Sequence, residues 1–332
     1  MTGFDYLRLL AAVLVVAHHA RVLDGKAPLL IGLGPDLGAL GVGAFFVISG
    51  YLVTASLRGA RRLSTFLAKR VLRIVPGLAA VLVLTAFVLG PWVSELSLLA
   101  YLNSAEPYLY VLRNLSLYAV SYDLPGVFAH TPFPGAVNGS LWSLRLELTC
   151  CLGLALLGAL RRVSGPILAG LALAAAATFV ALQLTDLDQR GAVFRVAYLA
   201  ALNGFLFLAG AAIQVADFKP RIWMATAGLV LVATPIWMLG LPLAVIGLGR
   251  TAPPKLPADL SYGLYIYSFP LQQALAERGH LGLATSLAVT LPFALGSWFL
   301  IEKPALAQKA RLALALDSRP SSRGLLREDR PA

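Results

Sequence analysis

The sequence predicts an all-α, polytopic integral membrane protein with about ten transmembrane helices and both termini in the cytoplasm. Of the 332 residues, 58% are hydrophobic and only 13% are charged, with a mean hydropathy of +0.78. A soluble domain carries about 25% charged residues. Apolar stretches long enough to span a bilayer recur along the chain, and basic clusters recur after every second stretch. A chain of this composition cannot bury its apolar residues in one soluble core.

The apolar stretches define the expected spans, since a spanning helix needs about 20 mostly apolar residues. They cover residues 4–23, 38–57, 74–93, 141–160, 165–184, 192–215, 222–238, 239–250, 259–277 and 282–301. The run from Ile222 to Gly249 is too long for one untilted span and short for two. Pro235, Gly240 and Pro242 favour a break within it.

The distribution of basic residues decides the number of spans. The clusters are Arg58 to Arg73, Arg161 and Arg162, Lys219 and Arg221, Arg250 and Lys255, and the cations from Lys303 to Arg330. Ten spans place all of them on one side, which the positive-inside rule makes cytoplasmic. Nine spans would place the basic C-terminal tail outside. The net charge of +11 is therefore assigned to cytoplasmic loops and anionic lipid, and we expect no nucleic-acid partner.

The first apolar stretch contains Arg8 and His19, eleven residues apart. At about 100° and 1.5 Å per residue, they share one helix face and stand about 16.5 Å apart along the axis. Polar side chains in spans usually face a bundle interior or a watery cavity. A neutral imidazole is a good general base near pH 7. His18 points elsewhere and is interpreted as packing, while a helix–helix hydrogen bond is the alternative for His19.

Two further groups carry chemistry. Arg70 and Arg73 are three residues apart and would be neighbours on a helix, where they could hold phosphates or serve only as a topology signal. Glu147 lies in a span, where a carboxylate is costly unless it has a function, such as orienting an imidazole. Pairing with Arg145 or with a second basic residue is the alternative. No pattern of Cys and His spacing indicates a metal site.

Six motifs, in this order, resemble the membrane-bound acyltransferase 3 family of bacterial O-acyltransferases. They are FDYLRLLAAVLVVAHHA with Arg8 and His19, GVGAFFVISGYLV, FLAKRVLRIVP with Arg70 and Arg73, NGSLWSLRLEL with Trp142, Ser143 and Glu147, SYGLYIYSFPL, and FLIEKP. The resemblance makes residues 1–304 an acyltransferase-like transmembrane domain, followed by a disordered basic cytoplasmic tail at 305–332. The chain departs from the family at Ser268, where many relatives have His, which argues against an essential role for that position.

The resemblance implies a multi-pass enzyme of the bacterial inner (cytoplasmic) membrane. It would transfer an acyl group, with acetyl favoured, from cytoplasmic acyl-CoA to a hydroxyl of a cell-envelope or exported carbohydrate. His19 would deprotonate the acceptor, Glu147 would orient or tune the base, and Arg8, Arg70 and Arg73 would bind the acyl-CoA.

The expected partners follow from this reaction. They are acyl-CoA as a co-substrate, a carbohydrate or lipid-linked sugar acceptor, and membrane lipids, with no permanently bound cofactor and no metal. Trp142, Ser143 and Tyr262 are the expected acceptor contacts. Tyr262 begins a polar stripe that could line an acceptor path or only pack.

A polytopic transporter or flippase of a glycolipid or small polar solute is the alternative function. It would use the same intramembrane charges as a substrate path. It does not account for the placement of Arg70 and Arg73, and no inverted-repeat pairing of broken helices is visible in the sequence. A non-catalytic scaffold accounts least well for charged residues within spans.

Overall fold

The computed structural model describes residues 2–317, and within them the chain is helical without a β-strand. The long helices are α1 (Gly3–Val22), α2 (Leu37–Arg58), α3 (Leu63–Leu84), α7 (Leu141–Ala159), α8 (Gly165–Leu184), α9 (Ala192–Val215), α12 (Ser261–Glu277), α13 (Leu283–Ser297) and α14 (Lys303–Asp317). The shorter ones are α4 (Gly90–Val93), α5 (Leu98–Asn103), α6 (Glu106–Leu115), α10 (Ile222–Val232) and α11 (Trp237–Gly249), with a 3-10 turn at Leu187–Gln189. The predicted all-α membrane class is confirmed.

Seven continuous helical segments are long and apolar enough to cross a membrane. They are Gly3–Val22, Leu37–Arg58, Leu63–Val93, Leu141–Ala159, Gly165–Leu184, Ala192–Val215 and Leu283–Asp317. Each contains or overlaps one of the ten expected spans. The other three expected spans also correspond to helices, but α10, α11 and α12 have only 11, 13 and 17 residues. The number of complete crossings therefore remains a prediction.

The run from Ile222 to Gly249 breaks once, between Val232 and Trp237, around Pro235. Pro242, which the sequence also marked as a breaker, lies inside α11. The two short helices form a close hairpin, because a Cβ added at Gly240 would lie 2.5 Å from the carbonyl oxygen of Gly228. The break lies a few residues earlier than the expected boundary at 238, because the helix ends before Pro235, whereas Pro242 is accommodated within α11.

Two long segments contain a π-helical turn. Residues Thr85–Leu89 join α3 to α4, and residues Trp298–Glu302 join α13 to α14. Such turns insert one extra residue and rotate the face of the helix that follows, which is why they recur at functional sites. The helix α3 also begins at Leu63, eleven residues before the expected start of the third span, so Arg70 and Arg73 lie within a helix rather than a loop.

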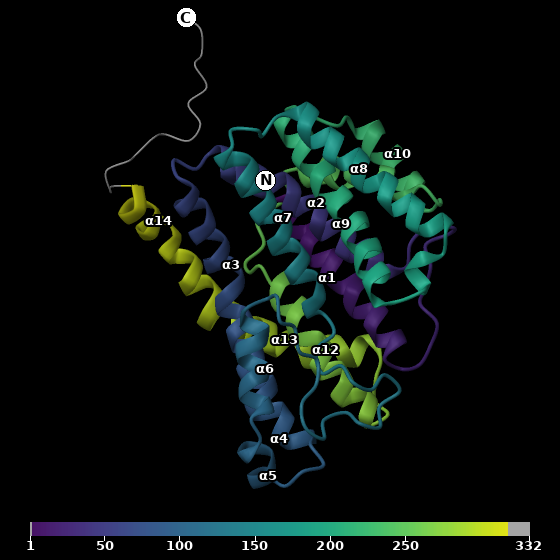
Figure 1. Cartoon of the computed structure of the whole chain (residues 1–332), viewed down its shortest axis with the longest axis vertical. Coiled ribbons are helices and arrows are strands. Elements are labelled where there is room, and N and C mark those ends of the chain that lie inside the picture. The colour runs from purple at the N-terminus through teal and green to yellow at the C-terminus, as the bar shows by residue number, and fades with distance from the viewer. Residues whose placement is uncertain (1, 318–332) are drawn as a thin grey trace, which may run out of the picture.

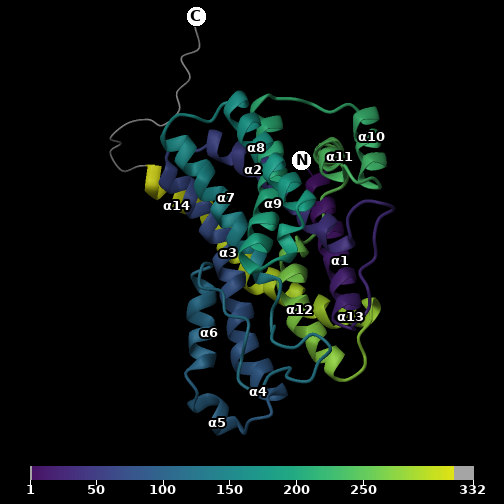
Figure 2. The same cartoon turned by 45° about the vertical axis from the view of Figure 1, so that its right-hand side comes forward.

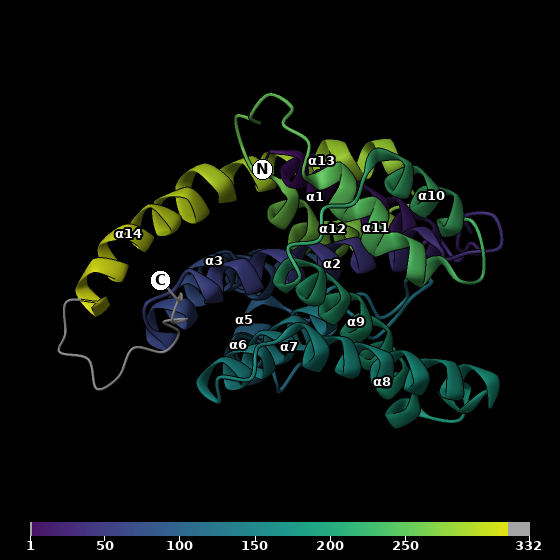
Figure 3. The ribbon, with the colours of Figure 1, turned by 90° about the horizontal axis from the view of Figure 1, so that it is seen from above.

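The C-terminal segment corrects one expectation. The sequence predicted a disordered tail from residue 305, but the chain is helical up to Asp317 in α14. Figures 1 and 3 show α14 beside α3 along one flank of the bundle. Residues 318–332 of the predicted tail lie outside the described residues.

The two ends of the bundle differ. Figures 1 and 2 show α4, α5 and α6 extending together from one end, away from the start of α1. Residues 94–140, which contain α5 and α6, form the longest connection between the long helices. Because the long helices alternate in direction, the basic connections after α2, α7 and α9 all lie at the opposite end.

Candidate functional site

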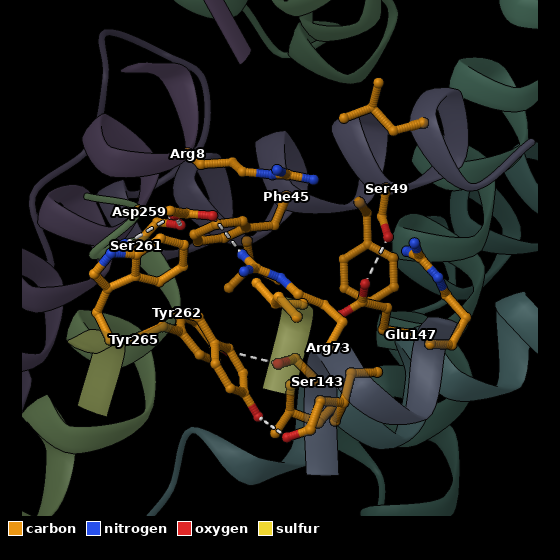
Figure 4. Close-up of a pocket in the computed structure, with 18 of the residues that line it drawn as sticks. Arg8, Phe45, Ser49, Arg73, Ser143, Glu147, Asp259, Ser261, Tyr262 and Tyr265 are labelled. Atoms are coloured by element: carbon orange, nitrogen blue, oxygen red, sulfur yellow. Dashed lines mark hydrogen bonds and ion pairs between the residues drawn. The ribbon is translucent and has the colours of Figure 1, made fainter. Parts of the chain in front are cut away.

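A cavity of about 340 Å³ lies between α1, α2, α3, α7, α12 and the segment from η3 (Trp298–Glu302) into α14. We call it the central cavity. Its polar lining consists of Arg8, Arg70, Arg73 and Lys309, the carboxylates Glu147 and Asp259, and Ser49, Ser143, Ser261, Tyr262 and Tyr265. This volume is within the range of small-molecule sites, roughly 300–1,000 Å³. Figure 4 shows the charged side chains converging from different helices.

Arg73 is the best-anchored cation of the central cavity. Its Nη2 donates to Asp259 Oδ2 over 2.7 Å, and its Nη1 lies 4.0 Å from Glu302 Oε2. Asp259 in turn accepts from Ser261 Oγ at 2.6 Å, and Glu302 accepts from Ser297 Oγ at 2.9 Å. Arg73 is therefore held by two carboxylates, each of which has its own hydroxyl partner.

Asp259 lies in the loop that precedes α12, and its ionisation reflects this neighbourhood. Burial raises the pKa of its carboxyl, but the nearby Arg73 and Arg8 guanidiniums and the hydrogen bonds from Ser261 and Arg73 outweigh burial. The net effect holds the pKa of Asp259 below its ordinary value. Sequence reasoning missed this residue. The sequence signal for Asp259 was its position two residues before Ser261, at the start of α12. There its Oδ1 accepts a hydrogen bond from the Ser261 amide, as the side chain of a helix-capping residue does.

The other two predicted arginines also line the central cavity, so Arg8, Arg70 and Arg73 do converge. Arg8 Nη1 lies 3.9 Å from Asp5 Oδ1, at the limit of an ion pair. Arg70 has a buried Nε without a hydrogen-bond partner among the described residues. Three guanidiniums from two helices therefore face one cavity.

Glu147 lines the central cavity from α7, and its Oε1 accepts from Ser49 Oγ of α2 over 2.6 Å. The sequence predicted that Glu147 orients His19. In the structure Glu147 is hydrogen-bonded to Ser49, and His19 is not among the cavity-lining residues. An interaction of Glu147 with His19 therefore stays a prediction. Figure 4 shows the Glu147 side chain of α7 pointing toward Ser49 of α2.

His19 lies beyond the central cavity, near the other end of α1. Its ring contacts Phe269 of α12 edge-on, with ring centroids 4.9 Å apart, and its Nδ1 is buried without a hydrogen-bond partner among the described residues. The imidazole that does meet a carboxylate is His18, whose Nδ1 lies 3.2 Å from Asp36 Oδ1. His18, interpreted from the sequence as packing, thus also has an electrostatic contact.

The expected acceptor contacts separate into two groups. Tyr262 and Ser143 line the central cavity. The Tyr262 hydroxyl donates to the Ile74 carbonyl at 2.8 Å, and the Ser143 hydroxyl shares a short hydrogen bond with the hydroxyl of Tyr265. Trp142 instead packs, partly buried, against the hydrophobic core and does not line the cavity.

Between the central cavity and His19, α12 carries buried polar groups. Ser268 is fully buried, and its Oγ has no hydrogen-bond partner in the described part of the chain. Asn138 is also fully buried and donates to the Ile266 carbonyl at 2.9 Å. Within residues 2–317, no group of three or more His, Cys, Asp or Glu side chains could hold a metal ion.

Comparison with known proteins adds the evolutionary context of this geometry. Residues 1–253 match a family model described as an acyltransferase domain. The chain is 28% identical over 330 residues to an O-acetyl transferase of Shigella phage Sf6, and the matched region covers 90% of this chain and 94% of that protein. It is 30% identical over 355 residues to nodulation protein 10 of Rhizobium leguminosarum bv. viciae, and the matched region covers 93% of this chain and 94% of that protein. No solved structure matches the chain significantly.

Proposed function

This chain belongs to the acyltransferase family whose model it matches over residues 1–253, and from that premise we propose that it is a membrane O-acetyltransferase using cytoplasmic acetyl-CoA. The acceptor is a hydroxyl of a cell-envelope or exported carbohydrate, free or lipid-linked. The observation that carries the proposal is the convergence of Arg8, Arg70 and Arg73 with Glu147 on one cavity inside the bundle. Intramembrane charges of this kind are costly and mark functional sites.

The cationic cavity supports a phosphate-bearing donor. Guanidiniums bind phosphate oxygens with two parallel hydrogen bonds, and such bonds are stronger between charged partners. The basic connections after α2, α7 and α9 lie at the end of the bundle where α1 begins. The positive-inside rule supports placing that end in the cytoplasm of a bacterial inner membrane. The donor would then enter from the cytoplasmic side and extend its thioester arm toward His19.

His19 is the proposed general base. It takes the proton of the acceptor hydroxyl as the hydroxyl oxygen attacks the thioester carbonyl carbon. The C–S bond then breaks, the acyl group remains on the acceptor oxygen, and the thiolate leaves and takes up a proton. Within residues 2–317, the buried His19 Nδ1 has no hydrogen-bond partner, and this supports the role because the nitrogen is not engaged by another of these residues. Arg8 steadies the donor, and Glu147 is held by Ser49 inside the cavity.

Thiol release from acetyl-CoA in membrane vesicles with the carbohydrate acceptor tests this function. His19→Ala is expected to lower the rate by about 10²–10⁴-fold, as for removal of a general base. His18→Ala is the matched control, because it removes the neighbouring imidazole, and it should retain most of the activity. Equal loss in both variants would contradict the assignment of His19.

Transport remains the competing function, and the same assay separates it. A transporter of a glycolipid or polar solute could use the charged central cavity as a path. It would consume no thioester, so the wild-type protein would release no thiol. Family membership favours the transferase.

A further inference from the structure

The cations of the central cavity are not equally compensated. Arg73 is bonded to Asp259 at 2.7 Å and approaches Glu302. Arg8 lies 3.9 Å from Asp5. Arg70 and Lys309, in contrast, have no carboxylate within ion-pair distance among residues 2–317. Both side chains are partly buried and line the central cavity. A cation that faces a cavity without a carboxylate partner is available to an anionic group of a ligand.

Lys309 belongs to the segment that the sequence predicted to be a disordered tail. Instead, α14 packs along α3 (Figure 3). Thr65 Oγ1 of α3 donates to Asp317 Oδ1 of α14 over 2.8 Å. Leu306 and Lys309 are three residues apart on α14, so they share one face, and both line the central cavity. Helix α14 therefore forms a wall of the cavity next to α3, which carries Arg70.

We propose that Lys309 is a further donor-binding residue, which contacts a phosphate group of the donor together with Arg70. The ammonium of Lys309 is a compact point charge and the guanidinium of Arg70 is a planar fork, and both are suited to phosphate oxygens. Lys309 thereby favours coenzyme A thioesters over thioesters that carry no phosphate, because it contacts the phosphate and not the acyl group. This inference rests on the proposed function, since it takes acyl-CoA as the donor. Lys309 lies outside the residues 1–253 that match the family.

The test compares two probes that differ in their phosphates. Coenzyme A carries phosphate groups, and pantetheine carries none. Binding of each to the full-length protein in lipid nanodiscs is measured by calorimetry. Lys309→Gln is expected to raise the Kd for coenzyme A by about tenfold to a hundredfold, as for loss of a charge-assisted hydrogen bond. The Kd for pantetheine should not change, and Lys309→Arg should restore most of the affinity for coenzyme A.

Arg311→Gln is the matched control. Arg311 lies on the same helix, carries the same charge and is exposed, and two residues after Lys309 it points to the opposite face. It should leave both affinities unchanged. In turnover, Lys309→Gln should raise KM for acetyl-CoA and leave kcat close to wild type. If Lys309→Gln fails to fold, Lys309→Met, which keeps the apolar stem, replaces it.

Each outcome decides a separate point. If the wild-type protein neither binds coenzyme A nor consumes acetyl-CoA, the proposed donor and with it the role of Lys309 are wrong. If the wild type binds coenzyme A and Lys309→Gln binds it equally well, only the role of Lys309 is wrong. Equal weakening of coenzyme A and pantetheine would show that Lys309 supports the fold of the cavity rather than contacting phosphate.

Discussion

Arg73 and Asp259 stand 186 positions apart in the sequence, yet Arg73 Nη2 donates to Asp259 Oδ2 over 2.7 Å. The two side chains are only 18% and 17% exposed. This pair ties α3 to the loop before α12 and fixes one side of the central cavity. Its partners Ser261 and Glu302 extend the same network toward α12 and the π-helical turn before α14.

Asp259→Asn is expected to destabilise the protein by roughly 3 kcal/mol, because it leaves a largely buried guanidinium without its main partner. Thermal unfolding in detergent measures this effect. A double-mutant cycle with Arg73→Gln should show strong non-additivity, since each single change already breaks the same pair. Additive effects of the two changes would contradict a direct interaction.

The same carboxyl predicts a pH dependence. The pKa of Asp259 is lowered in the folded state, because its charged neighbours outweigh its burial. Its contribution to stability is therefore complete above the unfolded-state pKa of about 3.9 and is lost as the pH falls through the lower folded-state value. The melting temperature of the wild type should drop more steeply below about pH 4 than that of Asp259→Asn. Parallel pH profiles would show that another group controls acid unfolding.

The hydrogen bond from Ser49 to Glu147 predicts a loss of activity when the hydroxyl is removed. Ser49→Ala leaves the carboxylate in place but frees it from its 2.6 Å partner. A hydrogen bond to a charged group contributes about 1.5–3 kcal/mol, so kcat/KM should fall about tenfold to a hundredfold. Ser49→Thr keeps the hydroxyl and should restore activity. If Ser49→Ala is as active as wild type, the hydrogen bond does not position Glu147 for the reaction.

The close contact of α2 with α9 predicts different outcomes for two glycines. A side chain added at Gly50 would enter the backbone of Phe207 in α9, whereas nothing lies within 4 Å of a Cβ added at Gly153 in α7. Gly50→Ala should therefore cost about 1–3 kcal/mol through overpacking. Gly153→Ala should be neutral or stabilising by up to about 1 kcal/mol, since alanine favours the helix. Melting temperatures of both variants in the same detergent provide the comparison.

Membrane topology is predicted by the charge pattern and is open to a direct test. Reporter fusions after Arg250 and at the exposed His130 should report opposite sides of the membrane, with Arg250 inside. Fusion after Arg162 is the matched control, and it should report the same side as Arg250. An outside signal after Arg250 would mean that α10 and α11 do not cross as two separate spans.

The sequence by itself determined the class, the family and most of the helices. Apolar length alone predicts a membrane-spanning segment, because the bilayer fixes how many residues are needed. The six motifs were sufficient for the family resemblance, which the match over residues 1–253 confirms. Local spacing also indicated the three arginines, because Arg8 shares a helix face with His19 and Arg70 and Arg73 are three residues apart. The structure places all three at one cavity.

Only the tertiary structure decided which of these charges meet. Asp259 and Lys309 were not identified as site residues, and neither was Ser49, which is hydrogen-bonded to Glu147. Helical periodicity fixes the face on which a residue lies, but not the rotation and height of the neighbouring helix. Contacts between distant segments depend on packing, which a single local pattern does not specify.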